Sequence, residues 1–159
     1  MTEIRGRLRS TGRVAILVSQ YNERVTTRLL DGALACCQEA GLPPDAVDVC
    51  WLPGAFELGA AAAVAAESGR YSAIVALGCV VRGETAHFEF VAGEAARGLA
   101  EVAVRHALPV AFGVLTTDTM DQALARAGGA AGNKGYEAAE AALRAADALI
   151  QLRSGDAAP

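Results

Sequence analysis

Charged residues are scarce in this sequence. Asp, Glu, Lys and Arg make up 20% of its 159 residues, against roughly 25% in a typical soluble domain. Hydrophobic residues make up 53%, so we expect part of the surface to be buried against other subunits. Every apolar run falls short of the ~18–20 residues that span a bilayer, and the first residues lack the apolar core of a signal peptide. We therefore predict a cytoplasmic protein with no membrane association.

Cysteine and histidine are also rare, which argues against a metal site. None of the four cysteines forms a C-x-x-C pair, and two histidines are too few to assemble a zinc site easily. Cys36, Cys37 and Cys50 are interpreted as small buried hydrophobic side chains in a reducing compartment. The net charge of −4 and the lack of a basic cluster give no support to nucleic-acid binding.

The length favours one domain over residues 1–159. Four apolar runs have strand character, at residues 14–19, 47–52, 72–81 and 109–117. Three of them are nearly continuous Val, Ile, Leu and Ala, which is typical of parallel strands covered on both faces. Helical patterns separate or follow them, at residues 23–40, 54–68, 87–106, 120–127 and 134–153. This alternation predicts a three-layer α/β/α sandwich around a parallel four-stranded sheet.

The two ends of the chain fall outside this pattern. Residues 1–12 contain a short apolar-polar alternation, Ile4 to Leu8, which Ser10-Thr-Gly12 separates from the core. Taken alone, this segment is typical of a frayed terminus. Residues 154–159 are predicted to be a disordered tail.

The most informative segment is Gly78-Cys-Val-Val-Arg-Gly-Glu-Thr-Ala-His-Phe-Glu-Phe-Val91. An apolar strand stops here and is followed by polar side chains, as at the ligand sites of open α/β sheets. A lone histidine on a helix is more often structural, but His87 lies where a strand ends at a site. Histidine can donate and accept protons near neutral pH. We expect Gly83, Glu84 and Thr85 to start a helix, whose free N–H groups can bind phosphate.

Other candidate site residues follow or lie in the remaining strands, and each of them also has an ordinary structural explanation. Tyr21 follows the first strand and can simply fill the space at the helix start, with Asn22 as the N-cap. Glu57 ends Pro53-Gly-Ala-Phe-Glu57 after the second strand, where a glutamate commonly interacts with the helix dipole. Taken alone, Phe112 is a core residue of the last strand and Arg126 a solvated helix residue.

Together, Pro53–Glu57, the segment 78–91 and Arg126-Ala-Gly … Gly132-Asn-Lys-Gly135 resemble the lumazine synthase family. The resemblance runs from about Val14 to Leu149. It implies a flavodoxin-like strand order, an N-terminal arm that adds a strand to a neighbouring subunit, and no cofactor or metal. The implied reaction condenses 5-amino-6-(D-ribitylamino)uracil with 3,4-dihydroxy-2-butanone 4-phosphate. It yields 6,7-dimethyl-8-ribityllumazine, phosphate and water, in the penultimate step of riboflavin biosynthesis.

The resemblance also implies roles for individual residues, with His87 as the catalytic acid and base. Tyr21 stacks on the pyrimidine, although the family usually has Phe or Trp there. Phe112 and Arg126 reach the neighbouring subunit's site, where the planar guanidinium clamps phosphate. The implied pyrimidine and ribityl ligands are Tyr21, Ala55, Phe56, Glu57, Cys79, Val80, Val81 and Phe112. The implied phosphate ligands are Gly83, Glu84, Thr85, Arg126 and Lys134.

The resemblance further implies that the partners are small-molecule substrates and other copies of the same chain. The implied homo-oligomer is either a pentamer or a sixty-subunit icosahedral shell. In the family, a short connection between the last two helices accompanies shells. Here Gly128-Gly-Ala-Ala-Gly-Asn-Lys-Gly135 has that length, but Ala130 replaces a lysine. Riboflavin synthase is a further candidate partner.

Two other functions stay open from the sequence. A flavin- or lumazine-binding module of flavodoxin type would hold a phosphate at the same sheet edge, but the loop Gln20-Tyr-Asn-Glu23 is bulky and acidic for that purpose. A non-catalytic self-assembling shell protein would have no reason to keep Glu57, His87 and Arg126 together.

Overall fold

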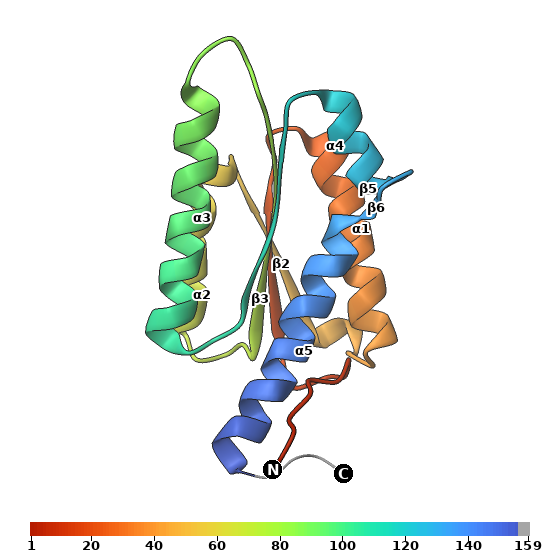
Figure 1. Cartoon of the computed structure of the whole chain (residues 1–159), viewed down its shortest axis with the longest axis vertical. Coiled ribbons are helices and arrows are strands. Elements are labelled where there is room, and N and C mark those ends of the chain that lie inside the picture. The colour runs from red at the N-terminus through yellow and green to blue at the C-terminus, as the bar shows by residue number, and fades with distance from the viewer. Residues whose placement is uncertain (156–159) are drawn as a thin grey trace.

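The structure is a computed structural model that describes residues 1–155. Its centre is a parallel four-stranded sheet in the order β2–β1–β3–β4, which confirms the expected architecture and strand order (Figure 1). The strands are β1 (Val14–Ser19), β2 (Val47–Leu52), β3 (Ala73–Val81) and β4 (Val110–Thr117). All four point the same way, so their carboxyl ends meet at one edge of the sheet.

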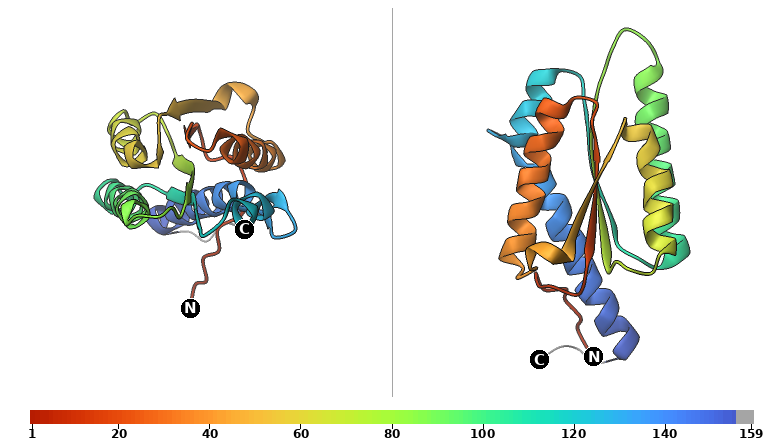
Figure 2. Two further views of the ribbon diagram at one scale, coloured as in Figure 1. Left: turned by 90° about the horizontal axis from the view of Figure 1, so that it is seen from above. Right: turned by 180° about the vertical axis from the view of Figure 1, so that it is seen from behind.

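Helices cover both faces of the sheet. On one side lie α1 (Glu23–Glu39), the short α4 (Met120–Arg126) and α5 (Lys134–Ser154), and on the other α2 (Leu58–Glu67) and α3 (His87–His106) (Figure 2). Helix α1 packs on α5, and α2 packs on α3. Among the described residues, none of the helices is both long and apolar enough to cross a membrane.

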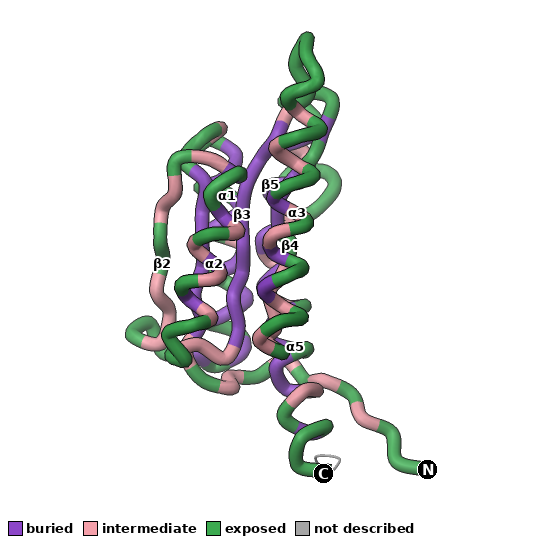
Figure 3. Tube along the Cα trace, turned by 90° about the vertical axis from the view of Figure 1, so that its left-hand side faces the viewer, coloured by how far each residue is buried: buried purple, intermediate pink, exposed green. Residues whose placement is uncertain are grey.

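The continuous apolar runs of the sequence follow from these two covered faces. Val14, Ile16 and Val18 of β1 point into the core under α1 and α5, and the alternate residues Ala15 and Leu17 point into the core under α2. Burial is concentrated in the central strands (Figure 3). A strand with both faces buried has no polar side to alternate with, which explains the sequence pattern.

The edge strand β2 is the exception. Its middle residues, Val49 and Cys50, are exposed. The prediction that Cys50 is buried is therefore wrong, whereas Cys36 and Cys37 are buried as expected. The reason is that β2 pairs on one side only, and the helices cover it incompletely.

Two predicted helix starts differ from the structure. After β2, the chain first forms a 3₁₀ turn, η2 (Ala55–Glu57), before α2 begins. After β3, residues 83–85 are not helical, and α3 begins at His87 with Ala86 as its N-cap. Gly83, Glu84 and Thr85 therefore form a loop ahead of the helix rather than its first turn.

The motif around Gly135 has a packing role. Asn133 caps α5, because its side-chain oxygen accepts the N–H groups of Gly135 and Tyr136 at 2.8 and 3.2 Å. A Cβ on Gly135 would lie 1.9 Å from the carbonyl oxygen of Leu29, so only glycine allows α5 to approach α1 this closely. An unpredicted two-stranded hairpin, β5 (Ala127–Gly129) and β6 (Gly132–Asn133), precedes the helix.

The N-terminal arm is held along α5 rather than detached from the core. Asp147 of α5 is fully buried and accepts the backbone N–H of Arg7 and the side chain of Arg9. A Cβ on Gly6 would lie 1.9 Å from the carbonyl oxygen of Arg144, so the arm and the helix are in close contact. At the other end, Ser154 is the last residue of α5 and Gly155 is its C-cap, so the prediction of disorder is wrong for these two residues. The remaining tail, 156–159, lies outside the described residues.

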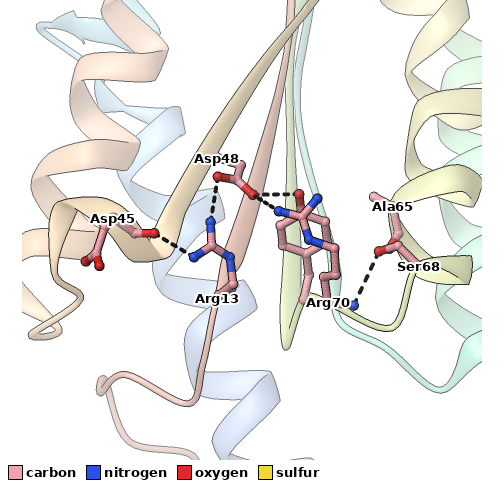
Figure 4. A network of polar contacts seen from close by, with 7 residues as sticks. Arg13, Asp45, Asp48, Ala65, Ser68 and Arg70 are labelled. Carbon is pink, nitrogen blue, oxygen red and sulfur yellow. Dashed lines mark hydrogen bonds and ion pairs between the residues drawn. The ribbon is translucent and has the colours of Figure 1, made fainter.

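A polar network joins the amino ends of three strands. Asp48 of β2 accepts hydrogen bonds from Arg13 at 2.7 Å, Arg70 at 3.0 Å and the hydroxyl of Tyr71 at 2.7 Å (Figure 4). These bonds hold the pKa of the Asp48 carboxyl below its ordinary value. The network lies at the opposite end of the strands from the loops that the sequence analysis singled out.

Candidate active site

A cavity of about 680 Å³ lies at the carboxyl ends of the strands. The loops after β1, β2 and β3 contribute to it, and β1 and β3 are the neighbours at which the strand order reverses. Open α/β sheets bind ligands at such a switch point. The cavity is lined by Tyr21, Pro53, Gly54, Ala55, Phe56, Glu57, Cys79, Val80, Val81, Gly83, Thr85, His87, Phe88, Phe90 and Val91. The structure thus brings together ten of the predicted site residues.

Hydrogen bonds join the segments that follow β1, β2 and β3 where these segments line the cavity. The backbone N–H of Tyr21 donates to the carbonyl of Pro53 at 3.1 Å. Asn22 occupies the N-cap position of α1, but its side chain does not cap the helix. Instead, its amide donates to the carbonyl of Cys79 at 2.9 Å. Asn22 has a φ of 60°, a left-handed conformation that asparagine tolerates better than most residues. The loop after β1 is thereby tied to both neighbouring loops.

Two aromatic rings stand open to solvent at the cavity. Tyr21 is 73% exposed and Phe56 is 57% exposed. Large exposed aromatic side chains beside a cavity are typical of surfaces that become covered by a ligand or a partner. Ala55, between Gly54 and Phe56, is buried, so its backbone rather than its side chain is what a ligand could contact.

Glu57 uses one carboxylate oxygen for a hydrogen bond within the protein and presents the other to the cavity. One carboxylate oxygen accepts the backbone N–H of Gly54, the residue before η2, at 2.9 Å. This contact fixes the orientation of the side chain along the cavity wall. The second oxygen remains available to accept hydrogen bonds from a ligand's hydroxyl groups.

His87 lies at the first position of α3, and its side chain is exposed in the cavity. The first N–H groups of a helix have no partners within the helix and favour anions. Here the side chain of Thr85 accepts the N–H of His87 at a long 3.4 Å. Gly83 and Thr85 line the cavity beside this helix end, whereas Glu84 is exposed and is not among the lining residues.

Cys79 contributes its backbone rather than its thiol. Its side chain is buried, and burial raises the pKa of the thiol to about 11, although the amide of Asn22 acts in the opposite direction. At neutral pH the sulfur is therefore protonated and a poor nucleophile. Within residues 1–155, no cluster of His, Cys, Asp and Glu side chains is arranged to hold a metal ion.

Phe112, Arg126 and Lys134 do not join the other predicted residues within one chain. They line a separate hollow of about 410 Å³ between β4 and α5. Phe112 is 47% exposed, so its interpretation as a core residue is wrong. Arg126 donates to the carbonyl of Gln122 at 3.0 Å, and Lys134 pairs with Glu137 at 2.6 Å. The three residues share one face, where a second molecule can contact them.

Three lining residues and the nearby Arg82 had no predicted role. Phe88, Phe90 and Val91 line the cavity from the first turns of α3. For Phe90 and Val91, three and four residues after His87, helical spacing was the available signal, because such residues share one face of a helix. Arg82 was named only as part of the segment, and its contacts with Glu89 and Asp118 could not be found from spacing.

The chain is similar to known proteins. The family model for 6,7-dimethyl-8-ribityllumazine synthase matches residues 11–149. A protein of Edwardsiella ictaluri (strain 93-146) named 6,7-dimethyl-8-ribityllumazine synthase is 51% identical over 143 residues, which cover 89% of this chain and 92% of that protein. The matched region contains every strand and all of the predicted site residues.

Proposed function

Because the chain belongs to the 6,7-dimethyl-8-ribityllumazine synthase family, we propose that the cavity at the carboxyl ends of its strands binds the two substrates of that reaction. The enzyme condenses 5-amino-6-(D-ribitylamino)uracil with 3,4-dihydroxy-2-butanone 4-phosphate to 6,7-dimethyl-8-ribityllumazine. The observation that carries the assignment of the site is that one cavity gathers Tyr21, Glu57 and His87 from the three segments that follow β1, β2 and β3.

The pyrimidine binds between the open aromatic rings and the strand ends. Tyr21 and Phe56 cover its ring, and stacking removes their exposed faces from water. The backbone at Ala55 and at Cys79, Val80 and Val81 reads the ring's carbonyl and N–H groups. The free oxygen of Glu57 accepts hydrogen bonds from the ribityl hydroxyls.

The phosphate of the second substrate binds at the start of α3. The amino end of α3 and the adjoining loop 83–85 favour an anion there, because the dipole of a helix is positive at its start. Arg126 and Lys134 supply positive charge from a second subunit, because in one chain they line a different hollow from His87. A guanidinium can bind two phosphate oxygens at once.

His87 then moves the protons of the reaction. The primary amine of the pyrimidine attacks the ketone, and water leaves to form an imine. Phosphate is eliminated, and the second amine closes the ring with loss of water. His87 is exposed to the cavity and lies beside the phosphate position, so it can protonate a leaving group and deprotonate an amine. Holding the two reactants together can supply effective molarities of ~10⁵–10⁸ M, so positioning dominates the rate.

The proposed active form is a homopentamer in which neighbouring chains share each site. Exposed Phe56, Phe90, Phe112, Val64 and Val104 provide apolar surface for such contacts. The short connection that forms β5 and β6 supports a sixty-subunit shell as the larger assembly. The four free cysteines suit a cytoplasmic location, and riboflavin synthase is the candidate partner that would consume the product.

Mixing the purified protein with both substrates and following the absorbance of the lumazine tests this proposal. We expect product to form only when both substrates are present, in step with the release of phosphate. A flavin-binding module would bind product without forming it, and a shell protein would do neither. A correctly assembled protein that forms no lumazine would overturn the proposal.

A further inference from the structure

Arg82 is the first residue after β3, and its side chain has three partners on two other elements. Its guanidinium pairs with Glu89 on the first turn of α3 and with Asp118 in the turn after β4, the latter at 2.9 Å. It also lies over the ring of Phe88, 4.4 Å from the centroid. The backbone N–H of Arg82 donates to the carbonyl of Thr117 at 2.9 Å, so the whole residue is anchored.

These contacts close the loop of residues 83–86. Arg82 precedes the loop, and Phe88 and Glu89 follow it, so one side chain joins its two ends. The loop has little else to hold it, because residues 83–87 are all exposed and the bond from the His87 N–H to Thr85 is long. The partly buried Phe88 packs against the core under α2 and α3 and gives the guanidinium a fixed surface.

The charges around Arg82 indicate that it is not itself a phosphate ligand. Its one positive charge faces two carboxylates, Glu89 and Asp118. The hydrogen bond from Arg82 is the main reason why the pKa of Glu89 lies below its ordinary value. Arg126 lines the same small hollow as Arg82, but its guanidinium donates to the backbone carbonyl of Gln122 rather than to a carboxylate, so its charge is available for an anion.

We propose that Arg82 is a positioning residue: it holds the loop 83–86 and His87 in the geometry that the reaction needs, and it links them to the turn after β4. This rests on the proposed function, because the loop is the proposed phosphate site. Single exposed ion pairs contribute little to global stability, so the effect of Arg82 is local.

The test compares Arg82→Ala with Arg97→Ala. Arg97 is the control because it too is an exposed arginine that pairs with two carboxylates, those of Glu94 and Glu101. These three residues lie on α3 and do not line the cavity. For Arg82→Ala we expect kcat to fall about 10-fold and KM for the butanone phosphate to rise about 10-fold, with KM for the pyrimidine changed less than about two-fold. We expect Arg97→Ala to stay within about two-fold of wild type in all three.

A charge-balanced variant separates positioning from simple repulsion. Arg82→Ala leaves two uncompensated carboxylates near the phosphate, and Glu89→Gln with Asp118→Asn removes them. If Arg82 positions the loop, the triple variant stays as slow as Arg82→Ala. If the triple variant recovers wild-type kcat and KM, the positioning role is wrong. Should Arg82→Ala fail to assemble, the double variant Glu89→Gln/Asp118→Asn breaks both pairs and leaves Arg82 in place, and the same loss of kcat is expected.

Amide hydrogen exchange without substrates makes the test independent of activity. Residues 83–88 should exchange faster in Arg82→Ala than in wild type, and Arg97→Ala should match wild type. Absence of lumazine formation by wild type would overturn the proposed function while this exchange difference could still be read. An active wild type whose Arg82→Ala variant matches Arg97→Ala in both kinetics and exchange would overturn the inference about Arg82 alone.

Discussion

At the scale of single residues, the cavity combines groups that react with groups that only present their backbone. His87 is exposed at the start of α3, where a proton can be exchanged with a substrate. Cys79 is buried at the end of β3, and burial raises the pKa of its thiol to about 11. Both side chains belong to the same short segment, so their different burial assigns them different chemistry.

We predict that Cys79→Ala keeps turnover within about three-fold of wild type, because the protonated thiol has no chemical task. In the native protein, a thiol reagent should leave Cys79 unmodified, and it should modify this residue only after unfolding. Modification of native Cys79 that abolishes activity, together with an inactive alanine variant, would show that the thiol takes part.

We predict that His87→Ala lowers kcat about 10- to 1000-fold, the range expected when a general acid and base is lost but the reactants are still held together. The binding of both substrates should change little, as measured by calorimetry. A complete loss of turnover in a correctly assembled oligomer would contradict this division between proton transfer and positioning.

At the scale of elements, the N-terminal arm shows how one buried side chain can hold a segment without secondary structure. Burial acts to raise the pKa of Asp147, but hydrogen bonds from the Arg7 N–H, Arg9 and Gln151 outweigh it and lower the pKa below the ordinary 3.8. A carboxyl whose pKa is lower in the folded state stabilises that state whenever it is ionised. Asp147 therefore ties the arm to α5 at neutral pH.

We predict that Asp147→Asn lowers the free energy of unfolding by about 1–2 kcal/mol at pH 7, since charge-assisted hydrogen bonds to the arm are weakened. The difference from wild type should stay constant above pH 3.8 and shrink as the pH falls below that value, through the lowered pKa of the folded state. Denaturant unfolding of both proteins at the same concentration, over a range of pH, measures this difference in the free energy of unfolding.

The matched control for this prediction is Glu140→Gln. Glu140 lies on the same helix and pairs with Arg144, but both side chains are partly exposed, whereas that of Asp147 is buried. We expect this control to change stability little. Equal effects of the two substitutions would mean that Asp147 does not anchor the arm.

The boundaries of the regular elements were predictable where local signals were strong. The ranges of β1, β2 and α3 agree with the sequence prediction, because their apolar patterns begin and end sharply. The separate expectation that residues 83–85 start a helix was wrong, since the path of the chain between β3 and α3 depends on tertiary contacts. The hairpin of β5 and β6 and the course of the arm also depend on contacts with distant segments, so local pattern could not reveal them.

The candidate site was predictable where its residues follow directly from the order of strands and loops. Residues at the carboxyl ends of parallel strands converge whatever their separation in sequence, so Tyr21, Glu57 and His87 could be grouped without a structure. Arg82 could not be assigned a role, because its partners Glu89 and Asp118 come from two other elements. The interpretation of Phe112 as core failed because β4 is an edge strand with an open end.

At the scale of the whole molecule, we propose that two neighbouring chains complete each site, because the predicted residues of one chain lie in two separate hollows. The cavity with Glu57 and His87 opens on one side of the sheet edge, and Phe112, Arg126 and Lys134 lie in a hollow on another. A ring that closes head to tail brings the first half of one chain against the second half of the next. This arrangement is the central claim of the account.

Mixing two variants of low activity tests the shared site most directly. One carries Glu57→Ala and His87→Ala, and the other carries Phe112→Ala and Arg126→Ala, so each alone damages every site in its own ring. If they are refolded together in equal amounts, roughly a quarter of the interfaces pair two intact halves, because each condition is met half of the time. The account predicts that activity rises to about a quarter of the wild-type value. Mixed rings that show no more activity than the average of the two parents would place the whole site within one subunit and contradict the account.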